Sequence, residues 1–308
     1  MPDAIKVGVL ILHYNHEKYI VECLNSIVVQ KTAGLFTFDI IITDDCSSDN
    51  SLKLIDDFGK QHPDVKITIL NSVRRMGVFH NVMKLFDVNG YDYYALMDGD
   101  DFWNYDEKLY QQIQFLENNS DYVGTCHDSL IQHEDANAKQ LLFSDAKNYS
   151  QQYSYRQDIF PWDILSRMII PTSSIVFRVD ALKKVDKKYL SDAYSLAWKI
   201  TVFLIRDSKF RYFNQPWSTY RNHSKGVSKS NVGNFHQSHI QFFKTLLKDS
   251  YYKYNKYWLY KAICFEYFTL IPIIKNESES SKVPLKYNID YLLCELKAAY
   301  YSLLLINK

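Results

Sequence analysis

The segment YALMDGDDFW, Tyr94–Trp103, combines the two features that organise this sequence. It begins as an apolar run of strand character and ends in three carboxylates within four residues, Asp98, Asp100 and Asp101. Carboxylates this close repel one another, so a partner must offset the cost. Mg²⁺ and Mn²⁺ are bound in proteins by one or two carboxylates together with substrate phosphates. The segment therefore predicts a divalent-metal site at the end of a strand; a solvated acidic turn is the alternative.

Strand and helix signals alternate through the first third of the chain on either side of this segment. Short apolar runs predict strands at 7–12, 39–43, 65–70 and 93–97. Helical periodicity predicts helices at 17–30, 78–86 and 107–118, and a further helix that Asp49 caps and Pro63 ends. Asn15 or His16 is expected to cap the first helix. This alternation indicates an α/β fold with a mostly parallel sheet between helices.

Polar clusters follow three of the predicted strands. They read HYN at 13–15, DDCSSD at 44–49 and DGDD at 98–101. Ligands of open parallel sheets bind outside the carboxyl ends of the strands. We therefore expect the three clusters to converge on one crevice.

The remainder of the chain is less regular. Residues 135–157 are polar and expected to be loop-rich, 169–178 to form a strand, 192–205 an amphipathic helix and 210–222 an extended segment. From about residue 235 the sequence is rich in Lys and Tyr and predicts helices, with a polar linker at 276–282. We expect these helices either to pack on the catalytic domain or in a homodimer, or to contact an anionic membrane surface.

Composition excludes several classes of protein. The chain has 308 residues, 47% of them hydrophobic, and a net charge of +1, so there is no electrostatic case for nucleic acid. Its five cysteines are scattered without CxxC spacing, which favours reduced thiols over a zinc site or disulfides. The first residues do not read as a signal peptide, and no apolar stretch reaches membrane-spanning length. These features favour a cytoplasmic protein. If its C-terminal helices contact a membrane, the protein would lie at the inner face of the cell membrane.

Three motifs in order and spacing resemble the family 2 glycosyltransferases of the GT-A fold. They are VGVLILHYNHEKYIVECLNSI, FDIIITDDCSSDNS and YDYYALMDGDDFW, and the resemblance covers roughly residues 5–225. It implies an inverting, metal-dependent transferase of the type that builds bacterial surface polysaccharides. The cofactor would be Mn²⁺ or Mg²⁺. The donor would be a nucleotide sugar, by preference a UDP-sugar, and the acceptor a saccharide or lipid-linked saccharide.

The same resemblance implies roles for individual residues. Tyr14 would stack on the base, Asp45 would accept the uracil N3–H, and Asp192, in a segment similar to the family's E-D motif, would be the general base. The full nucleotide-binding set is Leu12, Tyr14, Asn15, Asp45, Arg75, Asp98 and Arg221. The metal-binding set, which includes the DXD carboxylates, is Asp98, Asp100 and His223.

Each assignment has a simpler structural alternative. Tyr14 would be a packed aromatic, Asp45 a turn residue, Asp192 a helix cap and His223 a surface histidine. The sequence also departs from the family pattern. Leu12-His13 stands where Pro-Thr or a similar pair is common, and Cys46 replaces Gly or Asn. His80 replaces an Arg before Asn81, and Ser191 replaces a Glu. Arg75 is expected to compensate for the missing Arg.

The resulting expectation is a catalytic domain at 1–234, with a nucleotide-binding half at about 1–125 and an acceptor half at about 126–234, followed by a helical region at 235–308.

Two alternative functions are not enzymatic: a receiver-like signalling domain and a glycan-binding protein with a degenerate site. A third is a nucleotidyltransferase that makes nucleotide sugars, which would want a Gly-rich phosphate loop that LHYNHEKY lacks.

Overall fold

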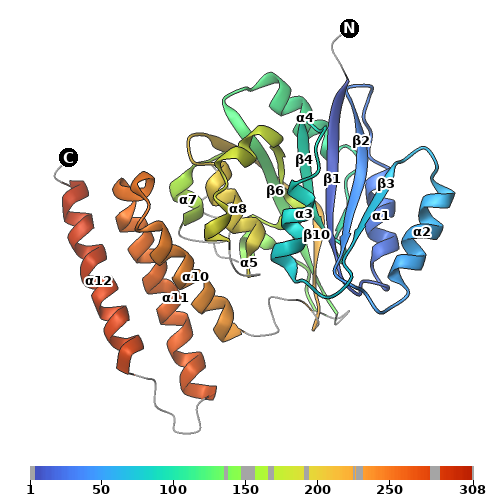
Figure 1. Ribbon diagram of the computed structural model, residues 1–308. Helices are drawn as coiled ribbons and strands as arrows, with labels where there is room; N and C mark the ends of the chain where they lie inside the picture. Colours follow the sequence, from blue (N-terminus) through green and yellow to red (C-terminus); the bar gives the residue numbers. More distant parts are fainter. Residues whose placement is uncertain are drawn as a thin grey trace. The chain divides into compact units, whose positions relative to one another are not determined.

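The computed structural model describes residues 4–134, 138–146, 157–165, 170–190, 194–224, 226, 232–277 and 285–306. Its contacts divide the chain into two compact units (Figure 1). Unit 1 comprises Met1–Phe160, Ile169–Asp186 and Ile200–His223, and unit 2 comprises Pro161–Met168, Lys187–Lys199 and Ser224–Lys308. The second unit thus takes in two short segments from before residue 224 as well as the predicted C-terminal helices.

Unit 1 is built on one sheet whose long strands all run in the same direction. Its strand order is β3-β2-β1-β4-β9-β6-β10-β5. The long strands are β1 (Ile5–His13), β2 (Phe36–Asp44), β3 (Ile67–Asn71), β4 (Tyr93–Asp98), β6 (Tyr122–His133) and β10 (Lys209–Asn222). The short strands pair antiparallel with them: β5 (Phe102–Trp103), β7 (Leu141–Leu142), β8 (Asp158–Ile159) and β9 (Val176–Arg178). The α/β architecture expected from the alternating pattern is confirmed.

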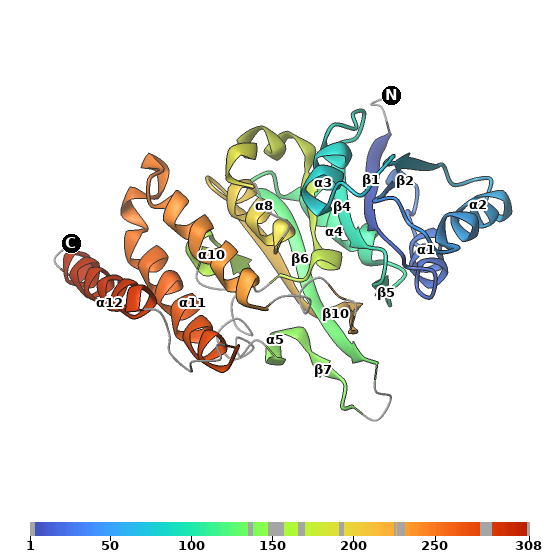
Figure 2. The same ribbon diagram turned by 60° about the horizontal axis from the view of Figure 1, so that its bottom comes forward.

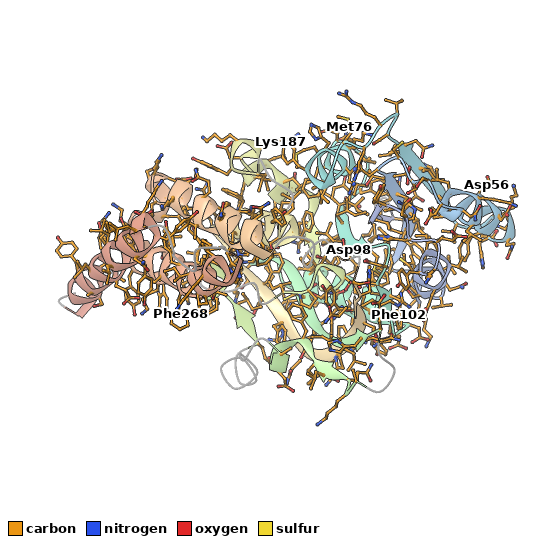
Figure 3. The ribbon with its side chains drawn as sticks, turned by 90° about the horizontal axis from the view of Figure 1, so that it is seen from below. Asp56, Met76, Asp98, Phe102, Lys187 and Phe268 are labelled. Atoms are coloured by element: carbon orange, nitrogen blue, oxygen red, sulfur yellow. The ribbon has the colours of Figure 1, made fainter. Side chains whose placement is uncertain are left out.

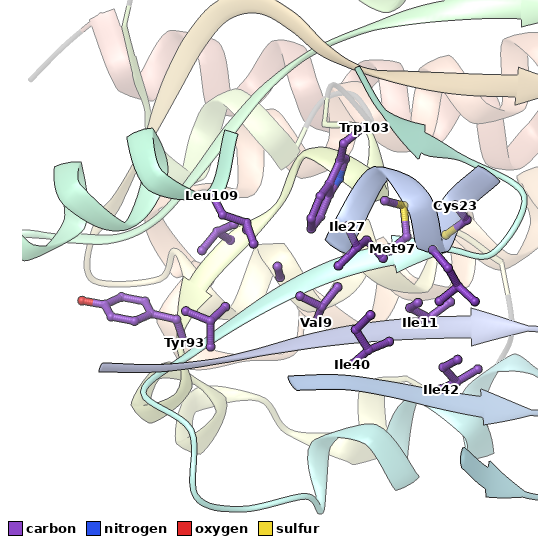
Figure 4. Packing of buried hydrophobic residues seen from close by; sticks show 14 of the residues in the cluster. Val9, Ile11, Cys23, Ile27, Ile40, Ile42, Tyr93, Met97, Trp103 and Leu109 are labelled. Carbon is purple, nitrogen blue, oxygen red and sulfur yellow. The ribbon is translucent and has the colours of Figure 1, made fainter. Parts of the chain in front are cut away.

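Helices cover both faces of this sheet. They are α1 (Ile20–Val28), α2 (Ser51–Gln61), α3 (Val78–Phe86) and α4 (Lys108–Asn118), with α5 (Phe143–Ala146) near β6. Alternate residues of a strand point to opposite faces, so Val7, Val9 and Ile11 share one core with α1, α2 and α4. Figure 4 shows this cluster around Val9, Ile11 and Met97. The helix α3 packs on β1 and β2 through Val82 and Leu85, which lie outside that cluster.

The elements differ from the sequence-based expectation in a few places. The strand expected at 169–178 is mostly absent from the described residues: Thr172–Ser174 form a 3-10 turn (η1), and only Val176–Arg178 pair with β4 and β6. Pro171 precedes this turn and has no N–H to give to a strand ladder. The expected cap of the first helix is also wrong, because Asn15 adopts a positive φ and α1 begins only at Ile20.

Unit 2 is largely helical (Figure 2). Its described elements are α7 (Pro161–Leu165), η3 (Lys187–Tyr189), α10 (Val232–Leu246), η4 (Ser250–Tyr254), α11 (Lys256–Glu277) and α12 (Leu285–Ile306). The helix α8 (Leu196–Leu204) is divided between the units, and η2 (Val179–Lys184) belongs to unit 1. The prediction of helices after residue 235 is confirmed.

None of the helices described here combines the length and the apolar character that crossing a bilayer requires.

Candidate active site

The carboxyl ends of β2, β1 and β4 lie side by side in the sheet. His13 at the end of β1 is in register with Asp44 of β2, and Leu12 is in register with Asp98 of β4. Asp98 is labelled in Figure 3, in the same unit as Phe102 of β5 and Met76 before α3. The three polar clusters that follow these strands therefore converge on one edge, as the parallel topology requires.

Tyr14, Asp45 and Arg75 form one end of this edge. The Arg75 guanidinium carbon lies 4.4 Å from the centre of the Tyr14 ring, and its Nε lies 3.9 Å from the Asp45 carboxylate. The Asp45 oxygens accept backbone N–H bonds from Met76 at 2.7 Å and from Gly77 at 3.0 Å. Asp45 is 6% exposed, whereas the Arg75 side chain is 70% exposed. The ring, the carboxylate and the guanidinium offer a stacking face, an acceptor and a cation within one small region.

The loops after β1 and β2 are tied together by Asn15. Its backbone N–H donates to Ser47 Oγ at 2.9 Å, and its side-chain oxygen accepts the Ser48 N–H at 2.8 Å. Cys46 has a φ of 65°, a backbone conformation that Gly and Asn adopt at lower cost. This explains why Gly or Asn would suit that position, and the Cys side chain is exposed there rather than packed.

Asp100 lies between two imidazoles. Its Oδ2 is 2.8 Å from His223 Nε2 at the end of β10 and 3.7 Å from His16 Nε2. Burial opposes ionisation of Asp100, but the hydrogen bond with His223 and the proximity of His16 outweigh it and lower the pKa of this carboxyl. Asp100 is therefore held as a carboxylate. Gly99 is required beside it, because a Cβ there would lie 2.7 Å from His16 Nδ1.

Asp98 and Asp101 differ from Asp100, because the pKa values of their carboxyls are raised rather than lowered. Burial raises the pKa of both carboxyls, and the charge of Asp100 raises them further. Asp101 is 1% exposed and accepts the backbone N–H of Arg221 at 3.0 Å, so it fastens β10 to the acidic segment. Asp98 ends β4 and also accepts a hydrogen bond from Thr172. A cation at this cluster would relieve the mutual repulsion that these raised pKa values express.

Arg221 is buried in contacts within the protein. Its guanidinium donates to the Asp100 carbonyl at 2.6 Å and pairs with Glu22 of α1. The guanidinium carbon also lies 4.6 Å from the centre of the Phe102 ring. These contacts leave its side chain 9% exposed. In this conformation Arg221 organises the acidic segment; contact with a phosphate would require it to leave Glu22.

The expected three-ligand metal site is not assembled in the described part of the chain. No group of three or more His, Cys, Asp or Glu side chains there could by itself hold a metal ion. Asp100 and His223 meet directly, whereas the carboxyl of Asp98, at the end of β4, accepts a hydrogen bond from Thr172. The donor types nevertheless suit a hard divalent cation that takes its remaining ligands from substrate phosphates. The residues thus fit a metal that binds together with a nucleotide.

The candidate general base, Asp192, lies outside the described residues. Three contributors to the site were absent from the sequence-based set: His13, His16 and Glu22. His13 is buried, its Nε2 lies 2.8 Å from Ser51 Oγ, and burial and His16 lower its pKa to about 4. His13 ends β1 and His16 lies in the loop after it. Their position at the carboxyl end of a predicted strand is a signal that sequence reasoning could have used. Glu22 carries no such signal, because only the tertiary structure places it beside Arg221.

The fold and this edge define an α/β domain with an acidic, histidine-lined cluster at the carboxyl ends of its parallel strands. The glycosyl transferase family 2 profile matches residues 8–186, more than half of the chain. The chain belongs to glycosyl transferase family 2. It is 27% identical over 231 residues to the dTDP-rhamnosyl transferase RfbG of Shigella flexneri, covering 71% of this chain and 73% of that protein.

Other relatives extend beyond the matched region. The chain is 25% identical over 221 residues to an uncharacterized protein of Mycobacterium tuberculosis, and the match covers 72% of this chain but only 60% of that relative. Among solved structures, it resembles Staphylococcus aureus TarS 1-349 in complex with UDP-GlcNAc, with a TM-score of 0.66, 15% identity, and coverage of 94% of this chain and 79% of that one.

A second structural neighbour is the mannosyltransferase PcManGT from Pyrobaculum calidifontis in complex with GDP-Man and Mn²⁺. The TM-score is 0.59 at 14% identity, covering 98% of this chain and 88% of that one. At these identities the two neighbours establish the fold alone. They confirm the expected GT-A type of sheet and helices for this chain.

Proposed function

We propose that the protein is a metal-dependent inverting glycosyltransferase that moves a sugar from a nucleoside-diphosphate donor to a hydroxyl of a glycan or lipid-linked saccharide. One observation carries the proposal: three polar strand ends of a family 2 chain converge with Asp100, His16 and His223 at one edge of the sheet. Similar proteins support it: RfbG is named a dTDP-rhamnosyl transferase, TarS was solved in complex with UDP-GlcNAc, and PcManGT was solved in complex with GDP-Man.

The base of the donor is proposed to bind at Tyr14, Asp45 and Arg75. A pyrimidine would stack on the Tyr14 ring and give its N3–H to Asp45, which suits both uridine and thymidine. Arg75 now covers the Tyr14 ring at 4.4 Å, so it would move aside and then close over the base. Leu12 and Asn15, at the end of β1 and in the loop after it, are proposed to line the same pocket, and Asp98 to face the ribose or the metal.

The diphosphate is proposed to lie over the acidic segment. Asp98, Asp100 and His223 would hold Mn²⁺ or Mg²⁺ there together with the phosphates, and the bound cation would neutralise the charge that grows on the leaving nucleoside diphosphate. Arg221 is proposed to exchange Glu22 for a phosphate oxygen, for which its fork geometry is suited. Without that exchange it would act through its hold on the Asp100 carbonyl.

Transfer requires a base on the acceptor side. Asp192 is proposed to take the proton of the acceptor hydroxyl as its oxygen attacks the anomeric carbon from the face opposite the leaving group. The bond from the anomeric carbon to the donor phosphate breaks as the new glycosidic bond forms. An α-linked donor would therefore give a β-linked product.

A donor screen with the purified protein tests the proposal. Nucleoside-diphosphate release from UDP-, dTDP- and GDP-sugars would be measured with Mn²⁺, with Mg²⁺ and with EDTA, in the presence of saccharide acceptors. We expect release of UDP or dTDP that EDTA abolishes. Pyrophosphate formation from a nucleoside triphosphate and a sugar phosphate would identify a nucleotidyltransferase instead. Nucleotide binding without release from any donor would indicate a binding protein.

A further inference from the structure

The helix α12 carries an apolar stripe that no part of the described chain covers. The stripe consists of Leu285, Ile289, Leu292, Leu293, Leu296 and Tyr300, all of them exposed, with Leu285 at 72% and Leu296 at 68%. Positions 285, 289, 292 and 296 repeat at spacings of four and three residues, which places them in one row along an α-helix. An exposed apolar row of this length on a surface that faces water marks an interaction site.

The opposite face of α12 is already occupied. Cys294 and Ala298 are buried there, and the Tyr301 ring stacks on Tyr260 of α11 at a centroid distance of 5.7 Å. Asp290 accepts a hydrogen bond from Tyr267 at 2.8 Å and lies 3.4 Å from Lys244 of α10. The helix is thus fixed within unit 2 by its polar and small residues. The aliphatic residues of the stripe are turned outward, the reverse of a helix whose only role is to complete a core.

The exposed charged side chains described beside the α12 stripe are both lysines. Lys286 and Lys297 directly follow Leu285 and Leu296, and at 100° per residue both lie on the same flank of the row. They are the exposed charged side chains among those described on α12. Its two acids are engaged inward, Asp290 as above and Glu295 with Cys264 of α11. An incoming surface therefore meets apolar side chains bordered by lysines.

From this arrangement we infer that α12 docks on an anionic lipid bilayer, lying in the plane of the interface. The aliphatic side chains would enter the acyl boundary, while the lysine stems extend along it and place their ammonium groups among the phosphates. Tyr300 suits the same boundary, since its ring is apolar and its hydroxyl is wet. A second copy that docked through the same stripe would bring its own Lys286 and Lys297 to the contact, whereas anionic headgroups supply the opposite charge.

The helix α11 is consistent with this occupant. It exposes Phe265 and Phe268, the latter labelled in Figure 3, together with Lys261 and Lys275. Bulky aromatic and aliphatic side chains between lysines are the composition of interfacial helices. The inference does not depend on the donor, the metal or the base of the proposed reaction.

Vesicle flotation with the full chain tests the docking. Vesicles of phosphatidylcholine mixed with phosphatidylglycerol would be compared with pure phosphatidylcholine, at low and high salt. We expect co-flotation with the anionic vesicles that salt weakens, because the lysine contribution is screened. The double variant Leu292→Ser/Leu296→Ser should lower the partition coefficient roughly tenfold or more. Lys286→Ala/Lys297→Ala should lower binding to anionic vesicles and leave the weak binding to phosphatidylcholine unchanged.

Matched controls separate docking from a loss of fold. Val29→Ser changes an exposed apolar residue of unit 1 and should float like the unchanged chain. All substituted side chains are exposed, so circular dichroism and thermal unfolding should be unaffected. Failure of the full chain to float with anionic vesicles would overturn the inference, as would flotation that Leu292→Ser/Leu296→Ser leaves intact. A third outcome would assign the stripe to a second copy instead: the full chain does not bind vesicles, light scattering shows that it is a dimer, and the double variant is a monomer.

Discussion

At the scale of single residues, Asp45 illustrates how one side chain serves the local structure and the proposed chemistry together. Its carboxylate holds the segment before α3 by accepting two backbone N–H groups, from Met76 and Gly77. Asp45→Asn keeps one acceptor oxygen, so we expect the fold to survive with a loss of about 1 kcal/mol. Affinity for UDP or dTDP should fall roughly tenfold or more, because a charge-assisted hydrogen bond to the base is lost.

Calorimetry with both nucleotides and urea unfolding check this expectation. Asp64→Asn is a matched control, since Asp64 is exposed in the turn after α2. Unchanged nucleotide affinity in Asp45→Asn would leave Asp45 with a role in the loop alone.

The neighbouring carboxylates Asp100 and Asp101 should behave differently when substituted. Asp100→Asn removes the charge that a divalent cation needs but can keep the contact with His223, so transfer should fall by roughly 10²–10³-fold while the fold stays intact. Asp101→Ala leaves the Arg221 N–H without its buried partner and should cost about 1–3 kcal/mol of unfolding free energy. Nucleoside-diphosphate release and urea unfolding on both variants measure the contrast. Loss of stability in Asp100→Asn with normal transfer would reverse the two assignments.

Asp192 is the remaining residue on which the proposed chemistry depends. Asp192→Asn preserves the shape and capping ability of the side chain but cannot accept a proton. We expect donor affinity to survive and turnover to fall about 10²–10⁴-fold, the usual contribution of a general base. Steady-state kinetics beside nucleotide titration measure both quantities, and Asp180→Asn, an exposed aspartate, is the control. Near-normal turnover in Asp192→Asn would favour the helix-cap interpretation.

At the scale of elements, α10 and α11 are joined by a buried carboxylate. Glu266 of α11 lies 2.6 Å from His236 Nδ1 and 2.9 Å from His239 Nδ1, both on α10. The His239 Nε2 in turn lies 2.9 Å from Ser195 Oγ, just before α8. Burial opposes ionisation of Glu266, but the hydrogen bonds with His236 and His239 outweigh it and lower its pKa below the ordinary 4.5.

The sign of the resulting pH dependence follows from this lowered pKa. A carboxyl whose pKa is lower in the folded state contributes stability above its unfolded value, and that contribution is lost as the pH falls through the folded value. Glu266→Gln should therefore cost about 1–3 kcal/mol near neutral pH. Its difference from the unchanged chain should shrink below about pH 4.5. Urea unfolding of both proteins across this range is the measurement, and a difference independent of pH would contradict the charged state of Glu266.

At the scale of the whole molecule, the C-terminal helices are packing partners of earlier segments in unit 2. Trp198 of α8 is 2% exposed, and its ring lies 5.0 Å from that of His239 and 5.4 Å from that of Phe243. Its indole N–H donates to the Ile164 carbonyl at 2.8 Å. The boundary expected at 234/235 would cut between Trp198 and the aromatic rings that cover it.

A truncation series tests this dependence. A chain ending at residue 234 uncovers Trp198 and should melt at a lower temperature or aggregate, because a large apolar side chain becomes exposed. A chain ending at Glu277 keeps α10 and α11 and should retain the environment of Trp198. Thermal unfolding followed by tryptophan fluorescence compares the three lengths. Equal melting temperatures for the 234-residue chain and the full chain would indicate that the C-terminal helices are an independent appendage.

The sequence by itself determined the order of elements in unit 1 and the polar edge of its sheet. Apolar runs such as 7–12 and 93–97 are long enough to identify buried strands, and parallel topology then forces their carboxyl ends together. The polar clusters that contain Tyr14, Asp45, Asp98 and Asp100 were located for this reason, whereas the roles of these residues were expectations from the family resemblance. The positions of α3 and α4 followed similarly from periodicity, which is a local property of the chain.

Only the tertiary structure decided which partners those side chains have. Glu22 meets Arg221 across 199 residues of sequence, and His223 meets Asp100 across 123, so no local pattern encodes either pair. The same holds for α12: its sequence is amphipathic, but packing against α10 and α11 decides which face is buried. Local propensity and hydrophobic period fix elements, whereas the pairing of charges and the exposure of faces depend on contacts distant in sequence.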